Sequence, residues 1–192
     1  MGAHVCPWWL GWILASPVRK LIHDPARILG PLVREGMHVL EPGPGMGFFT
    51  LEVARRGGPT GRVDAVEPQP RMLAGLQRRA RRAGLDGRVE TRLAARDSLG
   101  VADLAGTIDL VLAFAVVHEM PEAYRFFSEI RPTLAPGGRV FLAEPTGHVS
   151  PADLERTFAA AARAGFRAAP GEALPRMRTA LLTPSADGTL AT

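Results

Sequence analysis

Short runs rich in Val, Leu and Ala alternate with amphipathic helical stretches along most of this 192-residue chain. Seven of these runs have the length of a β-strand: 38–42, 62–67, 89–94, 108–115, 139–144, 166–169 and 177–183. Between them, apolar residues recur at helical spacing, as in the stripe of Met72, Leu73, Leu76, Ala80 and Ala83. Strands that alternate with helices form βαβ units. The pattern therefore predicts an α/β domain on a doubly wound, mostly parallel sheet with helices on both faces.

Three glycines at alternate positions follow the first predicted strand. The segment reads V-L-E-P-G-P-G-M-G-F-F-T, with Gly43, Gly45 and Gly47 after Glu41. Glycine lets a ligand approach the backbone without meeting a Cβ, and the N–H groups of a following helix can meet polar ligand atoms. The second predicted strand ends in Glu67, whose carboxylate can accept two hydrogen bonds from a ribose diol. These residues fit a dinucleotide or an adenosyl cofactor, although G-x-G-x-G differs from the dinucleotide pattern G-x-G-x-x-G.

The composition is that of an ordinary globular protein, with 46% hydrophobic and 22% charged residues, which excludes disorder. Lys20 is the only lysine among 23 basic residues, and the net charge is +4. An arginine-rich tally of this kind is typical of a coding bias and is a weak argument for a polyanionic partner. With Cys6 as the single cysteine, no intramolecular disulfide and no cysteine-rich zinc site can form. We therefore expect a reducing, cytoplasmic location.

The N-terminal segment 5–14, VCPWWLGWIL, is apolar but too short to span a bilayer. It contains a proline and no Lys or Arg precedes it, so we predict neither a membrane span nor a signal peptide. Its tryptophans could cover a ligand or pack on the sheet edge, and we favour the second interpretation. They are Trp8, Trp9 and Trp12.

The predicted domain bounds follow from the character of the two terminal segments and from the residues that cap helices. We expect residues 1–35 to form a helical or lid segment, residues 36–183 to form the core domain, and residues 184–192 to be a frayed tail. Asp24 before Pro25 predicts a helix that runs to about Arg34. Ser150, Pro151 and Asp153 predict a capped helix that ends before Gly165.

Four segments carry motifs in a fixed order: E-P-G-P-G-M-G at 41–47, A-A-R-D-S-L at 94–99, D-L-V-L-A-F-A-V-V-H-E-M at 109–120 and L-A-P-G-G-R-V-F-L-A-E-P at 134–145. Together with Glu67, they resemble the signatures of class I S-adenosylmethionine-dependent methyltransferases, and most closely the small-molecule branch. The resemblance covers residues 39–145 in detail. It implies a Rossmann-like fold of seven strands with the last strand antiparallel, S-adenosyl-L-methionine as the cofactor and a small-molecule methyl acceptor.

The resemblance also implies which residues hold the cofactor. Glu67 falls where the family binds the ribose hydroxyls, and Asp97 falls where an acid commonly contacts the adenine amino group. The predicted cofactor-binding residues are Glu41, Gly43, Gly45, Gly47, Glu67, Pro68, Asp97, Ser98 and Phe114.

Four ionisable residues follow two of the predicted strands, His118 with Glu119 and Glu144 with His148. Ligands of an open parallel sheet bind beyond the carboxyl ends of its strands, so we expect these side chains to converge on the methyl acceptor. One interpretation makes His118 or His148 a general base that Glu144 or Glu119 orients. In the other, they shape the pocket without proton transfer. They could also ligate a metal, but Glu122 breaks the H-E-x-x-H pattern, and we predict no metal site.

We therefore predict a methyltransferase that acts on an unidentified, small acceptor. One alternative is a nucleotide-dependent oxidoreductase of Rossmann type, which the glycine spacing and the two strands after the last helix disfavour. Another is a non-catalytic, adenosylmethionine-binding regulatory module, because the family often has a polar residue at Phe114 and a second histidine at Glu119. A nucleic-acid target is disfavoured, since the arginines of 78–82 form the solvated face of a helix and no N-P-P-Y-like segment follows the fourth strand. The sequence does not indicate an oligomeric state.

Overall fold

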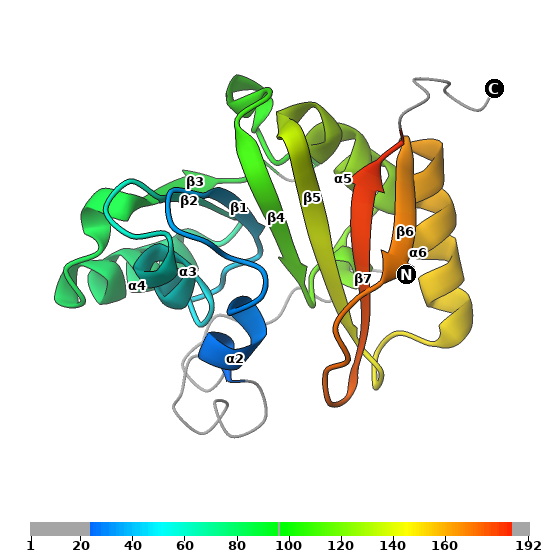
Figure 1. The fold of residues 1–192 in the computed structure, drawn as a ribbon, viewed down its shortest axis with the longest axis horizontal. Helices are drawn as coiled ribbons and strands as arrows, with labels where there is room; N and C mark the ends of the chain where they lie inside the picture. Colours follow the sequence, from blue (N-terminus) through cyan, green and yellow to red (C-terminus); the bar gives the residue numbers. More distant parts are fainter. Residues whose placement is uncertain (1–23, 96, 186–192) are drawn as a thin grey trace. The chain divides into compact units, whose positions relative to one another are not determined.

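A computed structural model describes residues 24–95 and 97–185, which form two compact units (Figure 1). One unit comprises residues 24–100 and the other residues 101–185. The described part of the chain contains seven strands, and the last of them, β7 (Met177–Pro184), runs antiparallel to both strands with which it pairs.

The unit of residues 24–100 contains three parallel strands, with β2 between the other two. These strands are β1 (His38–Pro42), β2 (Arg62–Glu67) and β3 (Val89–Leu93). The helices are α2 (Pro25–Leu29), α3 (Thr50–Arg56), α4 (Pro70–Arg82) and the 3-10 turn η2 (Asp86–Arg88). Both α3 and α4 pack against β2, and α4 also packs against β3. β1 and β2 are buried along most of their length, as expected for a parallel sheet that helices cover, and Val39, Leu40 and Ala65 are fully buried.

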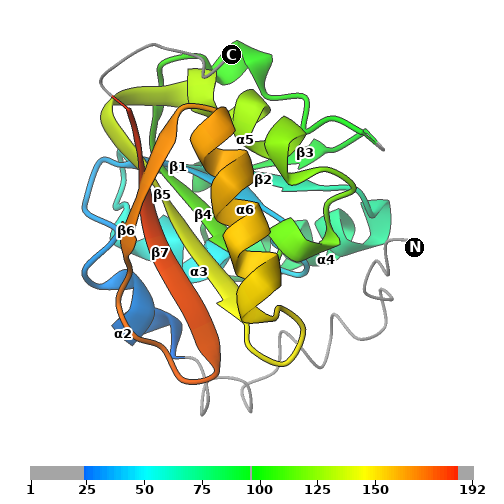
Figure 2. The same ribbon diagram turned by 90° about the vertical axis from the view of Figure 1, so that its right-hand side faces the viewer.

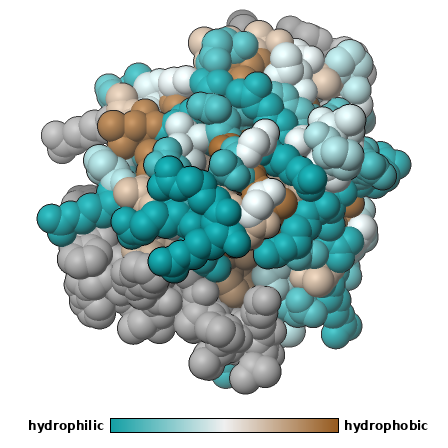
Figure 3. Space-filling view, turned by 90° about the vertical axis from the view of Figure 1, so that its left-hand side faces the viewer, coloured by the Kyte–Doolittle hydropathy of each residue, from teal (hydrophilic) through white to brown (hydrophobic). Residues whose placement is uncertain are grey.

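The helix α4 shows how the sequence pattern becomes packing. Met72, Leu73, Leu76 and Ala80 are buried, as the apolar stripe predicts. Ala83 was expected in the same stripe but is exposed, because the helix ends at Arg82. The opposite face of α4 carries exposed arginines, and the surface on this side of the molecule is largely hydrophilic (Figure 3).

A buried carboxylate joins the three strands of this unit. The side chain of Asp64 on β2 is fully buried and lies 2.6 Å from Nε2 of His38, 3.1 Å from Nε of Arg62 and 2.5 Å from Nε of Arg92. Burial opposes ionisation of this carboxyl, but the hydrogen bonds from His38 and Arg92 and the charges of both arginines outweigh it and lower the pKa of Asp64. The ionised carboxylate therefore stabilises the folded sheet.

The unit of residues 101–185 contains four strands in the order β4-β5-β7-β6. They are β4 (Ile108–Phe114), β5 (Leu134–Pro145), β6 (Phe166–Pro170) and β7 (Met177–Pro184). The longer helices are α5 (Ala123–Ile130) and α6 (Pro151–Arg163), and the 3-10 turns are η3 (Ala102–Leu104), η4 (Val117–Glu119) and η5 (Arg131–Thr133). Figure 2 shows α6 alongside α5, and α6 also packs against β6. The ring of Phe127 on α5 reaches the ring of Phe166 on β6, with centroids 5.8 Å apart.

The sequence predicts the bounds of β1 and β2 without error, whereas β5 begins five residues earlier than predicted. Leu134 already pairs with Ile108, and the chain then bulges before Arg139 pairs with Leu110. Gly138 lies in this bulge, where a Cβ would lie 2.6 Å from the carbonyl oxygen of Ile108. The sequence does not indicate this early start, because Pro-Gly-Gly at 136–138 is typical of a turn.

Two helix predictions have different outcomes. The capped helix at Ser150 is confirmed, because Ser150 Oγ accepts the N–H of Asp153 at 3.2 Å and Asp153 Oδ2 accepts the N–H of Ser150 at 3.0 Å. The helix predicted to reach Arg34 is shorter and ends at Leu29. Pro31 accounts for the early end, since it has no N–H to continue the helix.

Several predictions stay open. The apolar segment 5–14 with its tryptophans, and most of the predicted tail, lie outside the described residues. The domain bounds 1–35, 36–183 and 184–192 therefore stay predictions. Among the described residues, no helix combines the length and the apolar character needed to cross a membrane.

Candidate functional site

The glycine loop after β1 adopts backbone angles that few other residues tolerate. Gly43, Gly45 and Gly47 have φ of +68°, +55° and +81°. A Cβ on Gly45 would meet no atom within 4 Å, whereas a Cβ on Gly47 would lie 2.3 Å from Cδ1 of Leu76 on α4. The two glycines therefore serve different purposes. Gly45 leaves one side of the loop open to a ligand, and Gly47 allows the loop to pack on α4. The helix α3 begins at Thr50, so the loop does not lead directly into it.

Glu67 ends β2 and is connected to this loop. Its side chain is buried, with Oε2 accepting the N–H of Gly45 at 3.2 Å and Oε1 accepting the N–H of Gln69 at 3.1 Å. These two bonds fix the orientation of the carboxylate beside the open side of Gly45. A carboxylate offers about four lone-pair positions, so a group held in this way is suited to accept the two hydroxyls of a ribose.

Glu41, at the end of β1 where the glycine loop begins, is the second acid beside this loop. It is buried, and burial raises its pKa to about 7. Within the described part of the chain, neither Oε2 of Glu41 nor Oγ1 of Thr50 has a hydrogen-bond partner. A buried polar atom without a partner costs about 1–3 kcal/mol. A ligand with a cationic N–H donor, such as the ammonium group of adenosylmethionine, would satisfy Glu41.

The remaining predicted cofactor residues are distributed over both units. Asp97 is exposed just beyond β3, and Ser98 Oγ accepts the N–H of Gly100 at 3.1 Å. Pro68 is exposed directly after Glu67. Phe114 is buried at the end of β4, in the unit of residues 101–185. A hydrogen bond from the N–H of Gly45 to Glu67 joins two members of the predicted set directly.

In the unit of residues 101–185, β4 and β5 bring His118 and Glu144 together. Nδ1 of His118, in the turn after β4, forms a hydrogen bond with Oε2 of Glu144, near the end of β5. Oε1 of the same carboxylate accepts the N–H of Val117 at 2.8 Å. The side chain of Glu144 is 1% exposed and that of His118 is 20% exposed. The carboxylate therefore holds the imidazole by one edge, with its other edge toward solvent.

This pairing sets the proton chemistry of the imidazole. The hydrogen bond that His118 donates to Glu144 and the charges of Glu144 and Glu119 raise the pKa of His118, although burial opposes the rise. When Nδ1 donates its proton to Glu144, the neutral ring has a lone pair on Nε2. No hydrogen-bond partner of Nε2 is found among residues 24–95 and 97–185. The arrangement can accept a proton at Nε2.

His148 and Glu119 surround this pair. The ring of His148 meets the ring of His118 edge to face, with centroids 5.8 Å apart and planes at 88°. Burial raises the pKa of Glu119, and the charge of Glu144 adds to the rise, while His118 and His148 oppose it. The four predicted residues thus interact. Of the two acids, it is Glu144 that forms a hydrogen bond with a histidine in the described part of the chain. The described residues contain no group of three His, Cys, Asp or Glu side chains arranged to hold a metal ion.

Ala115 is a residue of this site that sequence reasoning missed. It follows β4 with φ of +54°, a left-handed angle that is unfavourable for alanine. Its N–H donates to the carbonyl of Ala143 at 2.7 Å. The reversal at Ala115 directs the chain into η4, where Val117 and His118 meet Glu144. An alanine gives no local signal of this conformation, so no sequence pattern could have found it.

The strand arrangement, the open glycine loop and Glu67 define an α/β protein with a glycine-rich loop and an acid at the ends of its first two strands. A SAM-dependent methyltransferase from Aquifex aeolicus has a similar fold, with a TM-score of 0.79 at 21% identity over 93% of this chain and 98% of that chain. Residues 40–142 match the family of the methyltransferase domain, and the chain belongs to that family. The likeness confirms the predicted Rossmann-like fold of seven strands, and the family indicates S-adenosyl-L-methionine as the cofactor.

Two curated relatives are similar over this same region. One is an arsenite methyltransferase of Halobacterium salinarum, 33% identical over 57% of this chain and 27% of the relative. The other is a ubiquinone biosynthesis O-methyltransferase of Methylocella silvestris, 31% identical over 59% of this chain and 41% of the relative. The chain thus spans well under half the length of these relatives.

Proposed function

We propose that this chain transfers the methyl group of S-adenosyl-L-methionine to a small-molecule acceptor, with His118 as the general base. The match of residues 40–142 to the methyltransferase domain carries the proposal, because it includes the glycine loop, Glu67 and His118. The names of the two relatives support a small acceptor, since one refers to arsenite and the other to O-methylation in ubiquinone biosynthesis. The single cysteine favours a cytoplasmic location as part of this proposal.

The residues of the loop region would hold the cofactor. Glu67, fixed by two backbone N–H groups, would accept the ribose hydroxyls. Asp97 would receive the adenine amino group. Glu41 would face the cationic ammonium group, which favours the ionised form of a carboxyl whose pKa burial raises to about 7. The bound cofactor supplies a methyl group that its sulfonium already activates, so the protein mainly has to align the reactants and exclude water.

His118 would remove the proton that the acceptor loses. The hydrogen bond to Glu144 keeps the proton of the neutral imidazole on Nδ1. The lone pair on Nε2 can then take the proton that the substrate loses on methylation. As that proton arrives, the buried carboxylate stabilises the imidazolium, since it raises the pKa of His118. His148 is exposed, and within the part of the chain that the structure describes no buried carboxylate binds it, which favours His118 as the base. Such a base suits a weakly acidic acceptor, such as a phenol or an enol.

Formation of S-adenosylhomocysteine tests the proposal. The purified protein is incubated with S-adenosylmethionine and a panel of phenols, enols, thiols and arsenite, and both products are followed by mass spectrometry. We expect one acceptor class to give S-adenosylhomocysteine and methylated acceptor in equal amounts. We expect His118→Ala to lower turnover by about 10²- to 10⁴-fold with cofactor affinity unchanged. A protein that binds the cofactor but turns over no acceptor would favour the regulatory module instead.

A further inference from the structure

The glycine loop needs support from outside because its own backbone bonds are few. The N–H of Gly43 donates to the carbonyl of Val66 at 2.9 Å, and the N–H of Gly47 donates to the carbonyl of Pro44 at 2.9 Å. All three glycines of the loop are in the left-handed region, which a glycine leaves as easily as it enters. Glu67 holds one point of the loop through the N–H of Gly45. A second point lies one residue later, at the carbonyl of Met46.

Arg79 on α4 binds that carbonyl. Its Nη1 donates to the oxygen of Met46, across 33 residues of sequence. The same face of α4 lies directly against the loop. A Cβ on Gly75 would lie 3.1 Å from Cγ of Met46, and a Cβ on Gly47 would lie 2.3 Å from Cδ1 of Leu76. Gly75, Leu76 and Arg79 therefore form a seat for residues 46 and 47 of the loop.

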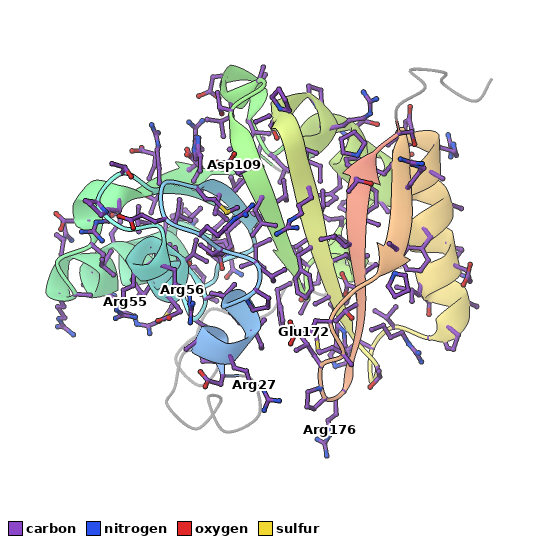
Figure 4. All side chains as sticks on the ribbon, in the orientation of Figure 1. Arg27, Arg55, Arg56, Asp109, Glu172 and Arg176 are labelled. Carbon is purple, nitrogen blue, oxygen red and sulfur yellow. The ribbon has the colours of Figure 1, made fainter. Side chains whose placement is uncertain are left out.

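The surroundings of Arg79 disfavour its positive charge. The guanidinium is part-buried, and burial together with the nearby positive charge of Arg55 lowers the pKa of Arg79. Arg55 lies in the last turn of α3 with Arg56 (Figure 4). Among the described residues, no acidic side chain forms an ion pair with Arg79. A hydrogen bond from a charged donor is stronger than one between neutral groups, and this guanidinium directs such a bond to the carbonyl of Met46.

We infer that Arg79 is a positioning residue for the cofactor, which holds the Met46 carbonyl so that the open side of Gly45 stays aligned with Glu67. Two side chains would then hold consecutive residues of the loop. Glu67 accepts the N–H of Gly45, and Arg79 donates to the carbonyl of Met46. The inference rests on the proposed function for its ligand, but the contact between Arg79 and the loop does not depend on that function. It also explains why α4 has an arginine at position 79 beside the buried stripe of Leu76 and Ala80.

The test compares Arg79→Met with Arg78→Met, which removes an exposed arginine one position away on the same helix. Calorimetry with S-adenosylhomocysteine measures the dissociation constant, and hydrogen exchange measures protection of the Gly47 N–H. We expect Arg79→Met to weaken binding about tenfold, or about 1.4 kcal/mol, and to increase exchange in the loop. Arg79→Lys keeps one donor and should fall between Arg79→Met and the wild type. Arg78→Met should match the wild type in both measurements.

The inference is overturned if Arg79→Met binds S-adenosylhomocysteine as the wild type does, or if Arg78→Met weakens binding equally. It is also overturned if exchange rises throughout the protein, because the arginine would then support the whole fold. Should Arg79→Met fail to fold, Arg79→Gln retains a donor of shorter reach and is judged by the same two measurements. If the wild type itself does not bind S-adenosylhomocysteine, the proposed function fails, and loop exchange alone decides whether Arg79 holds the loop.

Discussion

Replacement of Glu144 by Gln should change the proton chemistry of His118 with little change in shape. In the wild type, Oε1 of Glu144 accepts the N–H of Val117 and Oε2 binds Nδ1 of His118. In Glu144→Gln, the amide oxygen can still accept the N–H of Val117, so the NH₂ group faces Nδ1. The imidazole then has to accept at Nδ1 and carry its proton on Nε2. A ring in that tautomer cannot act as a base through Nε2.

The size of the effect follows from the same contacts. A hydrogen bond to a charged group contributes about 1.5–3 kcal/mol. Gln keeps the acceptor for Val117, and the side chain of His118 is one-fifth exposed, so we expect a loss of about 1–3 kcal/mol in the free energy of unfolding. Glu144 raises the pKa of His118 in the folded state, so this stabilisation is complete below the unfolded value of 6.5 and declines as the pH rises through the folded value. The loss should therefore be larger at pH 5.5 than at pH 8.5.

Two assays read this prediction without any methyl acceptor. Urea unfolding at both pH values gives the free energies, and NMR titration gives the pKa of His118. In Glu144→Gln, that pKa should fall, since the hydrogen bond and the charge of Glu144 that raise it are lost while burial still lowers it. Glu119→Gln serves as the matched control, because Glu119 acts on His118 by charge and should cause a smaller decrease. An equal loss of stability at both pH values, with an unchanged pKa of His118, would refute the reasoning.

Three further predictions concern the unit of residues 24–100. Glu67→Ala should weaken cofactor binding by about 1–3 kcal/mol in calorimetry, and unchanged affinity would remove Glu67 from the site. Gly45→Val should abolish binding but leave the circular dichroism spectrum intact, whereas Gly84→Val, at a similar φ of +65° and also in open space, should bind normally. Asp64→Asn should lower the free energy of unfolding by about 1–3 kcal/mol at pH 7, because it leaves the partly exposed Arg62 and Arg92 without their carboxylate. The lowered pKa of Asp64 means that the wild type should lose this advantage as the pH falls below 3.8, and a gap that stays constant would contradict the assignment.

The sequence predicts those parts of the fold that local patterns determine. The apolar runs fix β1 and β2 residue by residue, and the glycine spacing locates the loop between β1 and α3. Ser150 and Asp153 also suffice to locate the start of α6, because a capping box lies within one turn of helix. The rule that ligands bind beyond the carboxyl ends of parallel strands predicts that His118 and Glu144 lie close together, and the hydrogen bond between them agrees with it.

Other parts depend on contacts between residues far apart in the chain. The bulge before Arg139 depends on the strand that Leu134 meets, and the bond from Arg79 to Met46 depends on how α4 lies against the loop. The choice of Glu144 over Glu119 as the partner of His118 depends on the direction of each side chain, which residue spacing does not give. The left-handed backbone angle of Ala115 cannot be predicted from its sequence neighbours either, since the surrounding turn determines it.

Cofactor selection tests the central claim most directly. Calorimetric titration of the purified chain with S-adenosylmethionine, S-adenosylhomocysteine and NAD compares the leading function with the oxidoreductase alternative in one experiment. We expect both adenosyl ligands to bind one site per chain, and Glu67→Ala to weaken both. We expect NAD to bind far more weakly, because the loop has G-x-G-x-G in place of the dinucleotide spacing. Tighter binding of NAD than of S-adenosylmethionine would contradict the account.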